Sequence, residues 1–258
     1  MFALTKWYLD LVTDDGRALV AYSARLRWGP IRLDYSALLR SAPGLAPVES
    51  GSIRPSEAPH LDGDLITWQS APLGLVGSWR REATAITATL LDTEAGGIEW
   101  NCPMPRAEAS VTCGGETWVG RGYVETVILT IAPNRLPFRV LHWGRHLSDR
   151  HAVVWIEWAG ETNRRWVWLD GAELPAARLT STGLGLGDGR SVRFSASRDL
   201  RHQAVEANLS PAAAPVRRRL ARSLGGMREH KILSRSSLVG ANGAALDTGW
   251  AIHEEVTW

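Results

Sequence analysis

The fold prediction starts from residues 120–131, which read GRGYVETVILTI. Successive side chains of a strand point to opposite faces of the sheet. In an extended chain one face therefore carries Tyr123, Glu125 and Val127, followed by Leu129 and Ile131. That face is apolar except for Glu125. The segment predicts one long strand with a single acid on its apolar face.

Glu125 has two interpretations from the pattern alone. A buried ionised carboxylate is costly, so such a group is paired, hydrogen-bonded or protonated. A carboxylic acid that is kept neutral in an apolar hollow can donate a proton to an unreactive substrate. Alternatively, the strand is solvated here, or Glu125 meets one of the many arginines. Both interpretations stay open at this point.

Length and composition limit the classes of protein. The chain has 258 residues, enough for one large β domain or two small ones with a substantial core. Its net charge of +2 does not indicate a general binder of polyanions, so no nucleic-acid partner is expected. Its 13 Trp residues, against 3 Phe and 4 Tyr, either line a pocket with flat aromatic surfaces or fill a β core. Lys6 and Lys231 are the only lysines.

The cysteines and the N-terminus suggest no metal site and no membrane anchor. Cys102 and Cys113 are the only cysteines, and whether they are bonded stays open because two cysteines do not make a disulfide framework. No Cys/His group has zinc spacing, so no metal is expected. The N-terminus runs directly into a strand, and no stretch near 18 apolar residues follows. We expect a soluble, cytoplasmic protein without stable membrane insertion.

Short alternating segments and tight turns fill the chain. We count roughly 18 short strands and almost no helical period, which predicts antiparallel β barrels or sandwiches. Residues 98–101 and 107–113 are expected to be two separate strands. Residues 133–137 resemble a boundary, which gives domains at 1–132 and 138–258. Residues 211–222 form either a loop or a short helix, and their three arginines, 217–219, are interpreted as solvated rather than as phosphate ligands.

Two weak echoes suggest an internal repeat. The first relates residues 8–11 to residues 155–158, and the second relates residues 125–127 to residues 254–256. In the second echo each segment contains an acid on a late strand of its half. The echoes predict two similar barrels, each closed by its last strand.

Five short segments together resemble a known family. They are residues 7–16 (WYLDLVTDDG), 103–107 (PMPRA), 120–125 (GRGYVE), 143–146 (WGRH) and 249–254 (GWAIHE). They resemble the carotenoid 1,2-hydratases (hydroxyneurosporene synthases) and their AttH-type lipocalin-like relatives. The resemblance implies two consecutive lipocalin-like antiparallel β-barrels. It also implies addition of water to a terminal isoprenoid double bond through acid-initiated carbocation chemistry, without a cofactor; other relatives look like cyclases of natural-product intermediates.

The chain departs from the hydratase pattern at three places. The acid two residues after Tyr123 is Glu125 instead of Asp. The continuation that contains Asn in the hydratases is replaced by residues 126–128, Thr-Val-Ile. The His-x-Trp segment is present only as residues 98–100, Ile-Glu-Trp, so its histidine is missing. These departures concern the reaction more than the fold.

The candidate catalytic residues are Glu125, Tyr123 and Asp10. Glu125 is the candidate acid, with its pKa raised by desolvation, and Tyr123 would orient it or a water. Asp10 is either a second acid or a structural hydrogen-bonding group of the first hairpin. The candidate substrate-binding residues, which would offer π faces to a cation, are Trp100, Trp7 and Trp28.

Other features give weaker indications. His142 and His146 are either bases or hydrogen-bonded strand residues. The sequence has no G-x-S-x-G element, phosphate loop or dinucleotide fingerprint.

The leading hypothesis is a cofactor-independent enzyme that hydrates, cyclises or isomerises a hydrophobic isoprenoid-like or polyketide-like small molecule. The alternatives are a non-catalytic carrier of a lipophilic molecule, which a barrel would also serve, and a structural β domain. The identity of the substrate and the oligomeric state stay open.

Overall fold

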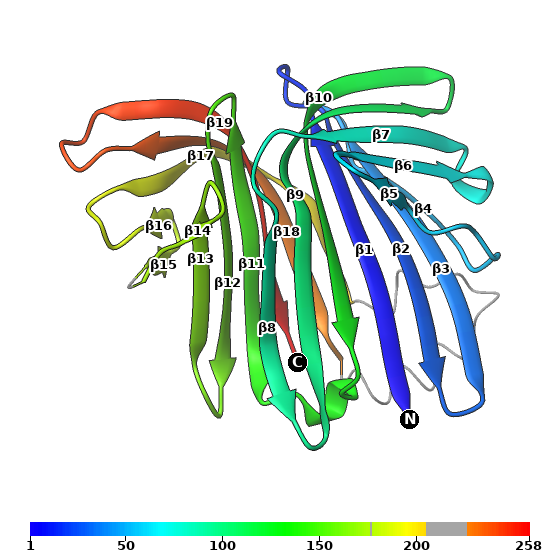
Figure 1. Cartoon of the computed structure of the whole chain (residues 1–258). Coiled ribbons are helices and arrows are strands. Elements are labelled where there is room, and N and C mark those ends of the chain that lie inside the picture. Colours follow the sequence, from blue (N-terminus) through cyan, green and yellow to red (C-terminus); the bar gives the residue numbers. More distant parts are fainter. Residues whose placement is uncertain (176, 205–225) are drawn as a thin grey trace. The chain divides into compact units, whose positions relative to one another are not determined.

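A computed structural model describes residues 1–175, 177–204 and 226–258. These residues form 19 strands and two short 3-10 helices, Ala71–Leu73 (η1) and Pro133–Arg135 (η2), and none of them is in an α-helix. The strand pairs described below are antiparallel, and the strands form two curled sheets (Figure 1). The prediction of an all-β chain with two consecutive antiparallel barrels is confirmed, each barrel being a curled half-barrel.

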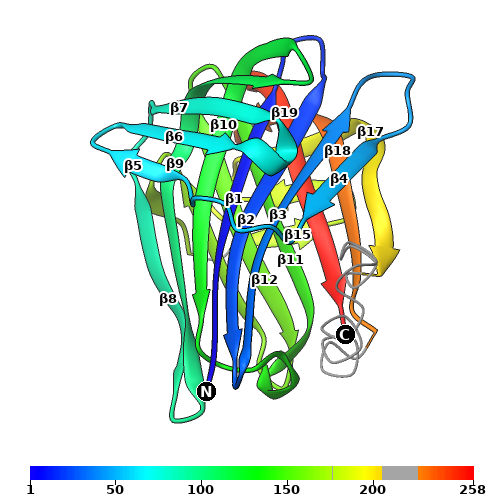
Figure 2. The same ribbon diagram turned by 90° about the vertical axis from the view of Figure 1, so that its right-hand side faces the viewer.

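The first sheet is formed by the N-terminal half of the chain. Its strands are β1 (Phe2–Val12), β2 (Ala18–Trp28), β3 (Ile31–Ser41), β4 (Val48–Ser52), β5 (His60–Asp62), β6 (Leu65–Ser70), β7 (Leu75–Arg81), β8 (Ile86–Thr93), β9 (Gly96–Cys113) and β10 (Glu116–Leu129). Their order is β4-β3-β2-β1-β10-β9-β7-β6-β5, with β8 paired to β9. The strands β5, β6 and β7 run across the direction of β1, β2 and β3, so the sheet curls (Figure 2).

The second sheet is formed by the C-terminal half. Its strands are β11 (Phe138–Ser148), β12 (Ala152–Gly160), β13 (Arg164–Leu169), β14 (Ala172–Glu173), β15 (Arg178–Thr180), β16 (Gly183–Gly185), β17 (Ser191–Ala204), β18 (Arg228–Val239) and β19 (Ala245–Thr257). Their order is β14-β13-β12-β11-β19-β18-β17-β16-β15. Read from one edge to the other, this order repeats that of the first sheet.

Each sheet pairs its first strand with its last. The strand β10 pairs with β1, and β19 pairs with β11 in the same way. The second sequence echo therefore relates equivalent strands, because residues 125–127 lie on β10 and residues 254–256 lie on β19. The first echo does not, because residues 8–11 lie on β1 whereas residues 155–158 lie on β12, the second strand of its sheet. The last strand of each half thus pairs with the first, as expected, but the described strands do not close a ring, because the sheets end at β4 and β5 and at β14 and β15.

One expected break in the first sheet is absent. Residues 98–101 and 107–113 are parts of a single strand, β9, which passes through Pro103 and Pro105. Proline removes a ladder donor and is tolerated at bulges. The β9–β10 register shifts twice here, between Gly122 and Val124 and between Val124 and Thr126. The prolines therefore mark a bulge opposite Glu125 rather than the end of a strand.

The cores lie inside the two curled sheets. The first contains Leu9, Leu11, Val124 and Trp79 among its buried apolar residues, and the second contains Trp155 and Val167. Val124 was expected on the face opposite the apolar one, yet it belongs to this core and Tyr123 does not. Both faces of β10 are buried at this point, because Tyr123 and Glu125 are buried as well as Val124.

Contacts group the described residues into two units, Met1–Leu136 and Pro137–Gln203 with residues 227–258. Within the described ranges, no helix is long and apolar enough to cross a membrane. The predicted segment 211–222, with arginines 217–219, lies outside the described residues. Cys102 and Cys113 are both buried and not bonded to each other.

Candidate functional site

The candidate site lies where β10 passes between β1 and β9. Tyr123 and Glu125 are two residues apart on β10, so their side chains lie on one face. The register places Asp10 of β1 opposite Tyr123 and Tyr8 opposite Glu125. All four residues are buried, which is unusual for two carboxylic acids so close together. The sheet thus brings two candidate acids and the candidate tyrosine to one place.

Two side chains donate hydrogen bonds to the same oxygen of Glu125. The indole Nε1 of Trp100 lies 2.6 Å from Oε2, and the hydroxyl of Tyr123 lies 2.7 Å from it. Both donors are neutral groups. Because Oε2 accepts both bonds, a proton on this carboxyl group would sit on Oε1. The arrangement fixes the carboxyl group and selects the oxygen that would transfer a proton.

The surroundings keep Tyr123 in its neutral form. Burial is the main cause that raises the pKa of Tyr123 well above 10.0, and the neighbouring Cys102 and Glu125 raise it further. Burial likewise raises the pKa of Cys102 well above its usual value. Tyr123 therefore acts as a hydrogen-bond donor, and Cys102 stays a thiol.

Cys102 is a member of the cluster that the sequence analysis did not predict. It was considered only as a disulfide partner, but its Sγ donates to the carbonyl oxygen of Val124 at 3.3 Å. It follows Trp100 by two positions on β9, which places it on the same face. The two-residue spacing from Trp100 is the signal that could have identified it.

Asp10 is less accessible than Glu125. Its residue is 0% exposed, as is Tyr123, whereas Glu125 keeps 6%. The backbone oxygen of Asp10 accepts a hydrogen bond from Nε1 of Trp79 at 2.8 Å. Of these three residues, Glu125 keeps the largest exposed fraction, although it too is buried.

Two of the three candidate substrate-binding tryptophans, Trp7 and Trp28, lie away from this cluster. Trp7 is on the other face of β1, where it packs against the first core beside Leu9. Trp28 is at the far end of β2, where its ring meets Phe2 at a centroid distance of 5.5 Å. The alternation of side chains along a strand separates two faces, but which residues of neighbouring strands share a face is known only once the strand pairing is known. Of the three tryptophans, only Trp100 contacts Glu125.

A small cavity opens on the inner side of the first sheet. It measures about 110 Å³ and is bordered by Trp7, Ser23, Tyr35 and Arg54, among others. Neither Glu125 nor Trp100 lines it. The cavity is thus separate from the cluster around the candidate acid.

The second sheet has a glutamate in the equivalent position, with different partners. Glu254 of β19 lies opposite Trp143 of β11, as Glu125 lies opposite Tyr8. The ammonium group of the fully buried Lys231 is paired with Glu254 and lies 3.5 Å from Glu229. It also lies 5.3 Å from the centroid of the Trp143 ring. Here the equivalent acid is the partly buried partner of a fully buried lysine.

The two candidate histidines are in the second unit. His146 is fully buried, and its Nδ1 lies 2.7 Å from Oγ of Ser236. Burial and the charge of Arg145 lower the pKa of His146 to about 4. His142 lies 3.7 Å from Oε2 of Glu255. Both are strand histidines with polar partners, which agrees with the interpretation of His142 and His146 as hydrogen-bonded strand residues.

Two curled antiparallel sheets of this topology define a lipocalin-like class of fold. No family model matches the chain, and no curated protein sequence matches it. Solved structures do match over nearly its whole length. CghA covers 99% of this chain and 88% of its own, at 14% identity and a TM-score of 0.62, and one matching structure is CghA with the compound Sch210972.

Two further structures share the fold. A protein described as an AttH from Nitrosomonas europaea has a TM-score of 0.57 at 10% identity, covering 98% of this chain and 91% of its own. Kievitone hydratase from Nectria haematococca has a TM-score of 0.55 at 9% identity, covering 98% and 88%. The chain therefore has the fold that CghA, the AttH protein and kievitone hydratase share.

Proposed function

We propose that this chain is an enzyme that protonates a carbon–carbon double bond of a hydrophobic small molecule without a cofactor. Glu125 is the proton donor. Tyr123 and Trp100 are positioning residues that fix its carboxyl group. Depending on the fate of the cation, the product is hydrated, cyclised or isomerised.

The observation that carries the proposal is the buried carboxyl group of Glu125 with two neutral donors on one oxygen. General acid catalysis needs an acid held in a fixed position with its proton directed to the substrate. Bonds from Trp100 and Tyr123 to Oε2 meet the first requirement, and they assign the proton to Oε1. The neutral carboxyl form is the form that donates a proton.

The reaction balances without an added oxidant or reductant. The proton leaves Oε1 of Glu125 and forms a C–H bond as the double bond of the substrate breaks, which leaves a cation on the adjacent carbon. Water then adds and loses a proton, or a second double bond attacks to close a ring and the new cation loses a proton, or the first cation loses a neighbouring proton directly. In each case the released proton restores Glu125. An aromatic face such as that of Trp100 stabilises a nearby cation by about 0.5–2 kcal/mol.

The structural neighbours support a small-molecule reaction of this kind. One of them is a hydratase of kievitone, and CghA has been crystallised with Sch210972. The sequence resemblance to the carotenoid hydratases points to an isoprenoid-like substrate. A polyketide-like substrate fits the same acid.

The variant Glu125→Gln tests the proposal. A candidate substrate is first identified by mass spectrometry of molecules that copurify with the native protein, and is then assayed in single turnover. Glutamine keeps the shape and can accept both hydrogen bonds, but it cannot deliver the proton. We expect the rate to fall by about 10²–10⁴-fold with little change in affinity or melting temperature.

The matched control is Glu99→Gln, because Glu99 is an exposed acid on β9 that bonds to Thr89. This variant should turn over at the parent rate. A Glu125→Gln protein that is folded, binds the molecule and reacts at the parent rate would exclude Glu125 as the acid. A loss of about 3–5 kcal/mol of stability, with activity falling only as the fold fails, would instead make Glu125 a structural partner of a cation. Binding without turnover in the parent protein would favour the carrier.

A further inference from the structure

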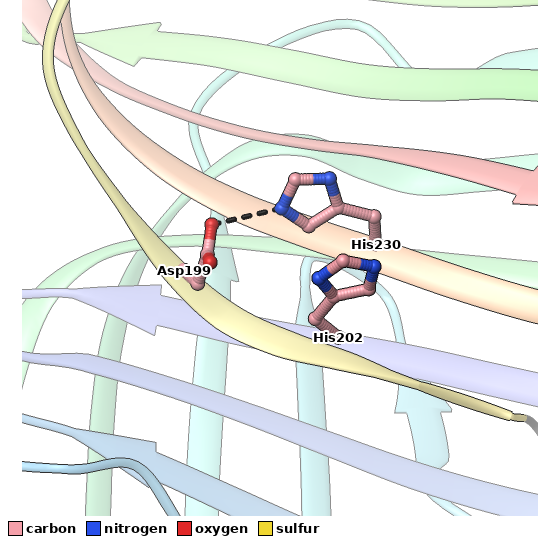
Figure 3. A group of neighbouring side chains, drawn as sticks. All are labelled: Asp199, His202 and His230. Carbon is pink, nitrogen blue, oxygen red and sulfur yellow. Dashed lines mark hydrogen bonds and ion pairs between the residues drawn. The ribbon is translucent and has the colours of Figure 1, made fainter.

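A group of metal-ligand side chains lies in the second unit, outside the candidate acid cluster. Among residues 1–175, 177–204 and 226–258, it is the one group of three or more such residues whose ligand atoms all lie within 4.8 Å of one another. It consists of Asp199 and His202 from β17 and His230 from β18. Figure 3 shows the three side chains directed into the same space between these two strands.

The contacts within the group are close. Nε2 of His230 lies 2.8 Å from Oδ1 of Asp199. The rings of His202 and His230 are stacked, with centroids 4.5 Å apart and 21° between their planes. The strands that carry them are joined by further bonds, including the ion pair of Arg201 with Glu229 at 3.1 Å. The group is therefore built on two linked strands of one sheet.

We propose that Asp199, His202 and His230 bind a divalent transition-metal ion of the zinc type. Two imidazole nitrogens and one carboxylate oxygen are a ligand set that zinc accepts in three-ligand sites, where water completes the coordination. Asp199 and His202 are exposed, so solvent can supply that water. Sequence spacing predicted no metal because His202 and His230 are far apart in the chain, and only the pairing of β17 with β18 brings them together.

The geometry requires a small contraction. At metal–ligand distances of about 2.0–2.1 Å, ligand atoms of a tetrahedral site are roughly 3.3–3.4 Å apart. The largest separation in the group is within 4.8 Å, so at least one side chain has to move inward. The exposed side chains of Asp199 and His202 can do so by rotamer changes that leave the strands in place. An ion bound here ties β17 to β18.

The test is a titration of the untagged full-length protein with Zn²⁺ against a chromophoric chelator. We expect one equivalent to bind, and His202→Ala, His230→Ala and Asp199→Asn each to weaken binding by at least about tenfold, since loss of a supporting outer ligand alone costs about 10–100-fold. Zn²⁺ should also raise the melting temperature of the parent protein more than that of His202→Ala. Co²⁺ in place of Zn²⁺ provides absorption bands that report the site directly.

The control is His151→Ala. His151 and Asp170 form a His–Asp pair of the same length, 2.8 Å, which no third ligand of the described residues joins. This variant should bind Zn²⁺ as the parent does. Absence of Zn²⁺ binding in the parent, unchanged binding in His202→Ala, or an equal loss in His151→Ala would each overturn the proposal. His202 is exposed, so its variant keeps the test valid even if His230→Ala is poorly folded.

Discussion

Glu125 and Glu254 occupy equivalent positions on the closing strands of two similar sheets, yet their environments differ. The donors to Glu125 are an indole and a phenol, whereas Glu254 meets the ammonium group of Lys231. A buried ion pair fixes the charge of both partners and binds them to each other. Trp100 and Tyr123 bring no charge of their own to Glu125, whereas Lys231 does to Glu254. The proposed acid and its counterpart thus differ in the charge of these partners.

The pair in the second unit gives a prediction about stability. Replacing Lys231 by Met leaves the partly buried Glu254 and the buried Glu229 without this ammonium partner, so we expect the free energy of unfolding to fall by about 3–5 kcal/mol. Urea unfolding measures this loss. The other lysine, Lys6, provides the control, because it is half-buried and lies 4.9 Å from the centroid of the Tyr22 ring. The variant Lys6→Met should lose no more than about 1 kcal/mol. Equal losses in the two variants would refute the assigned role of Lys231.

The meeting of Glu125 with Tyr123 was predictable from residues alone, because alternation places them on one face of β10. The contact with Trp100 was predicted as part of a wider aromatic set, of which Trp7 and Trp28 are elsewhere. Alternation is local, whereas the neighbours across a sheet depend on register and curl. The sequence analysis also left Cys102 out of the site, because it considered this thiol only as a disulfide partner and did not use its two-residue spacing from Trp100 on β9.

At the scale of the element, β10 has a glycine, Gly122, where the side chain of Trp79 packs against it. A Cβ atom on Gly122 would lie 2.6 Å from Cδ1 of Trp79 and 2.6 Å from Cβ of Ala109. The close approach lets the Trp79 indole reach the backbone oxygen of Asp10 at 2.8 Å. Gly122 thereby positions the strand segment that carries Asp10 beside the candidate site.

We expect Gly122→Ala to lower the free energy of unfolding by about 1–3 kcal/mol, because the added methyl group overpacks this contact. Thermal or urea unfolding measures it, and the near-ultraviolet circular dichroism of the tryptophans should change as Trp79 shifts. Gly185→Ala is the control, since its nearest atom would be an oxygen of Arg178 at 3.7 Å, an ordinary contact. A Gly122→Ala protein as stable as Gly185→Ala would show that Trp79 accommodates the methyl group freely.

The strands themselves were largely predictable, because period-two alternation and glycine-rich turns are local signals. The strand β9 was wrongly divided, since two prolines in five residues normally exclude a central strand. Here the bulge opposite Glu125 accommodates them, and a bulge is visible only in the register. The segment that departs most from local rules is thus the one beside the candidate site.

At the scale of the whole molecule, the second half repeats the strand order of the first. The buried histidines of this second half affect the stability of the protein. His146 and His253 both have a pKa lowered from 6.5 to about 4. Burial is the first cause for each. The charge of Arg145 adds to it for His146, and the charges of His230, Lys231 and His142 add to it for His253.

Stability should therefore decrease as the pH falls from about 7 to 4. In this range the unfolded chain binds protons at these two histidines and the folded chain does not, so acid favours unfolding. One pKa unit corresponds to about 1.4 kcal/mol, so the two groups contribute several kcal/mol. Urea unfolding at a series of pH values measures the slope. His146→Gln should flatten it, and His60→Gln, at an exposed position on β5, should not. A pH-independent free energy of unfolding would contradict the burial of these histidines as neutral groups.

The domain bounds expected from sequence, 1–132 and 138–258, stay predictions. The two-barrel fold was predictable because short motifs resembling a known family are spread along the chain. The partners of Glu125 and Glu254 could not be predicted from the echo. The echo between residues 125–127 and 254–256 relates the two strands, but it does not indicate which side chains lie beside each glutamate. Lys231 is far from both segments in the sequence, and only the pairing of β18 with β19 brings it to Glu254.

The pairing of first strand with last also has a consequence during synthesis. The strand β1 is synthesised before β2 to β9, but its partner β10 ends at Leu129, so one edge of β1 stays unpaired while the intervening strands are made. At about 5–20 residues per second that interval lasts on the order of ten seconds. An unpaired edge is a template for wrong pairing with another nascent chain. The same order of synthesis leaves one edge of β11 unpaired until β19 is made.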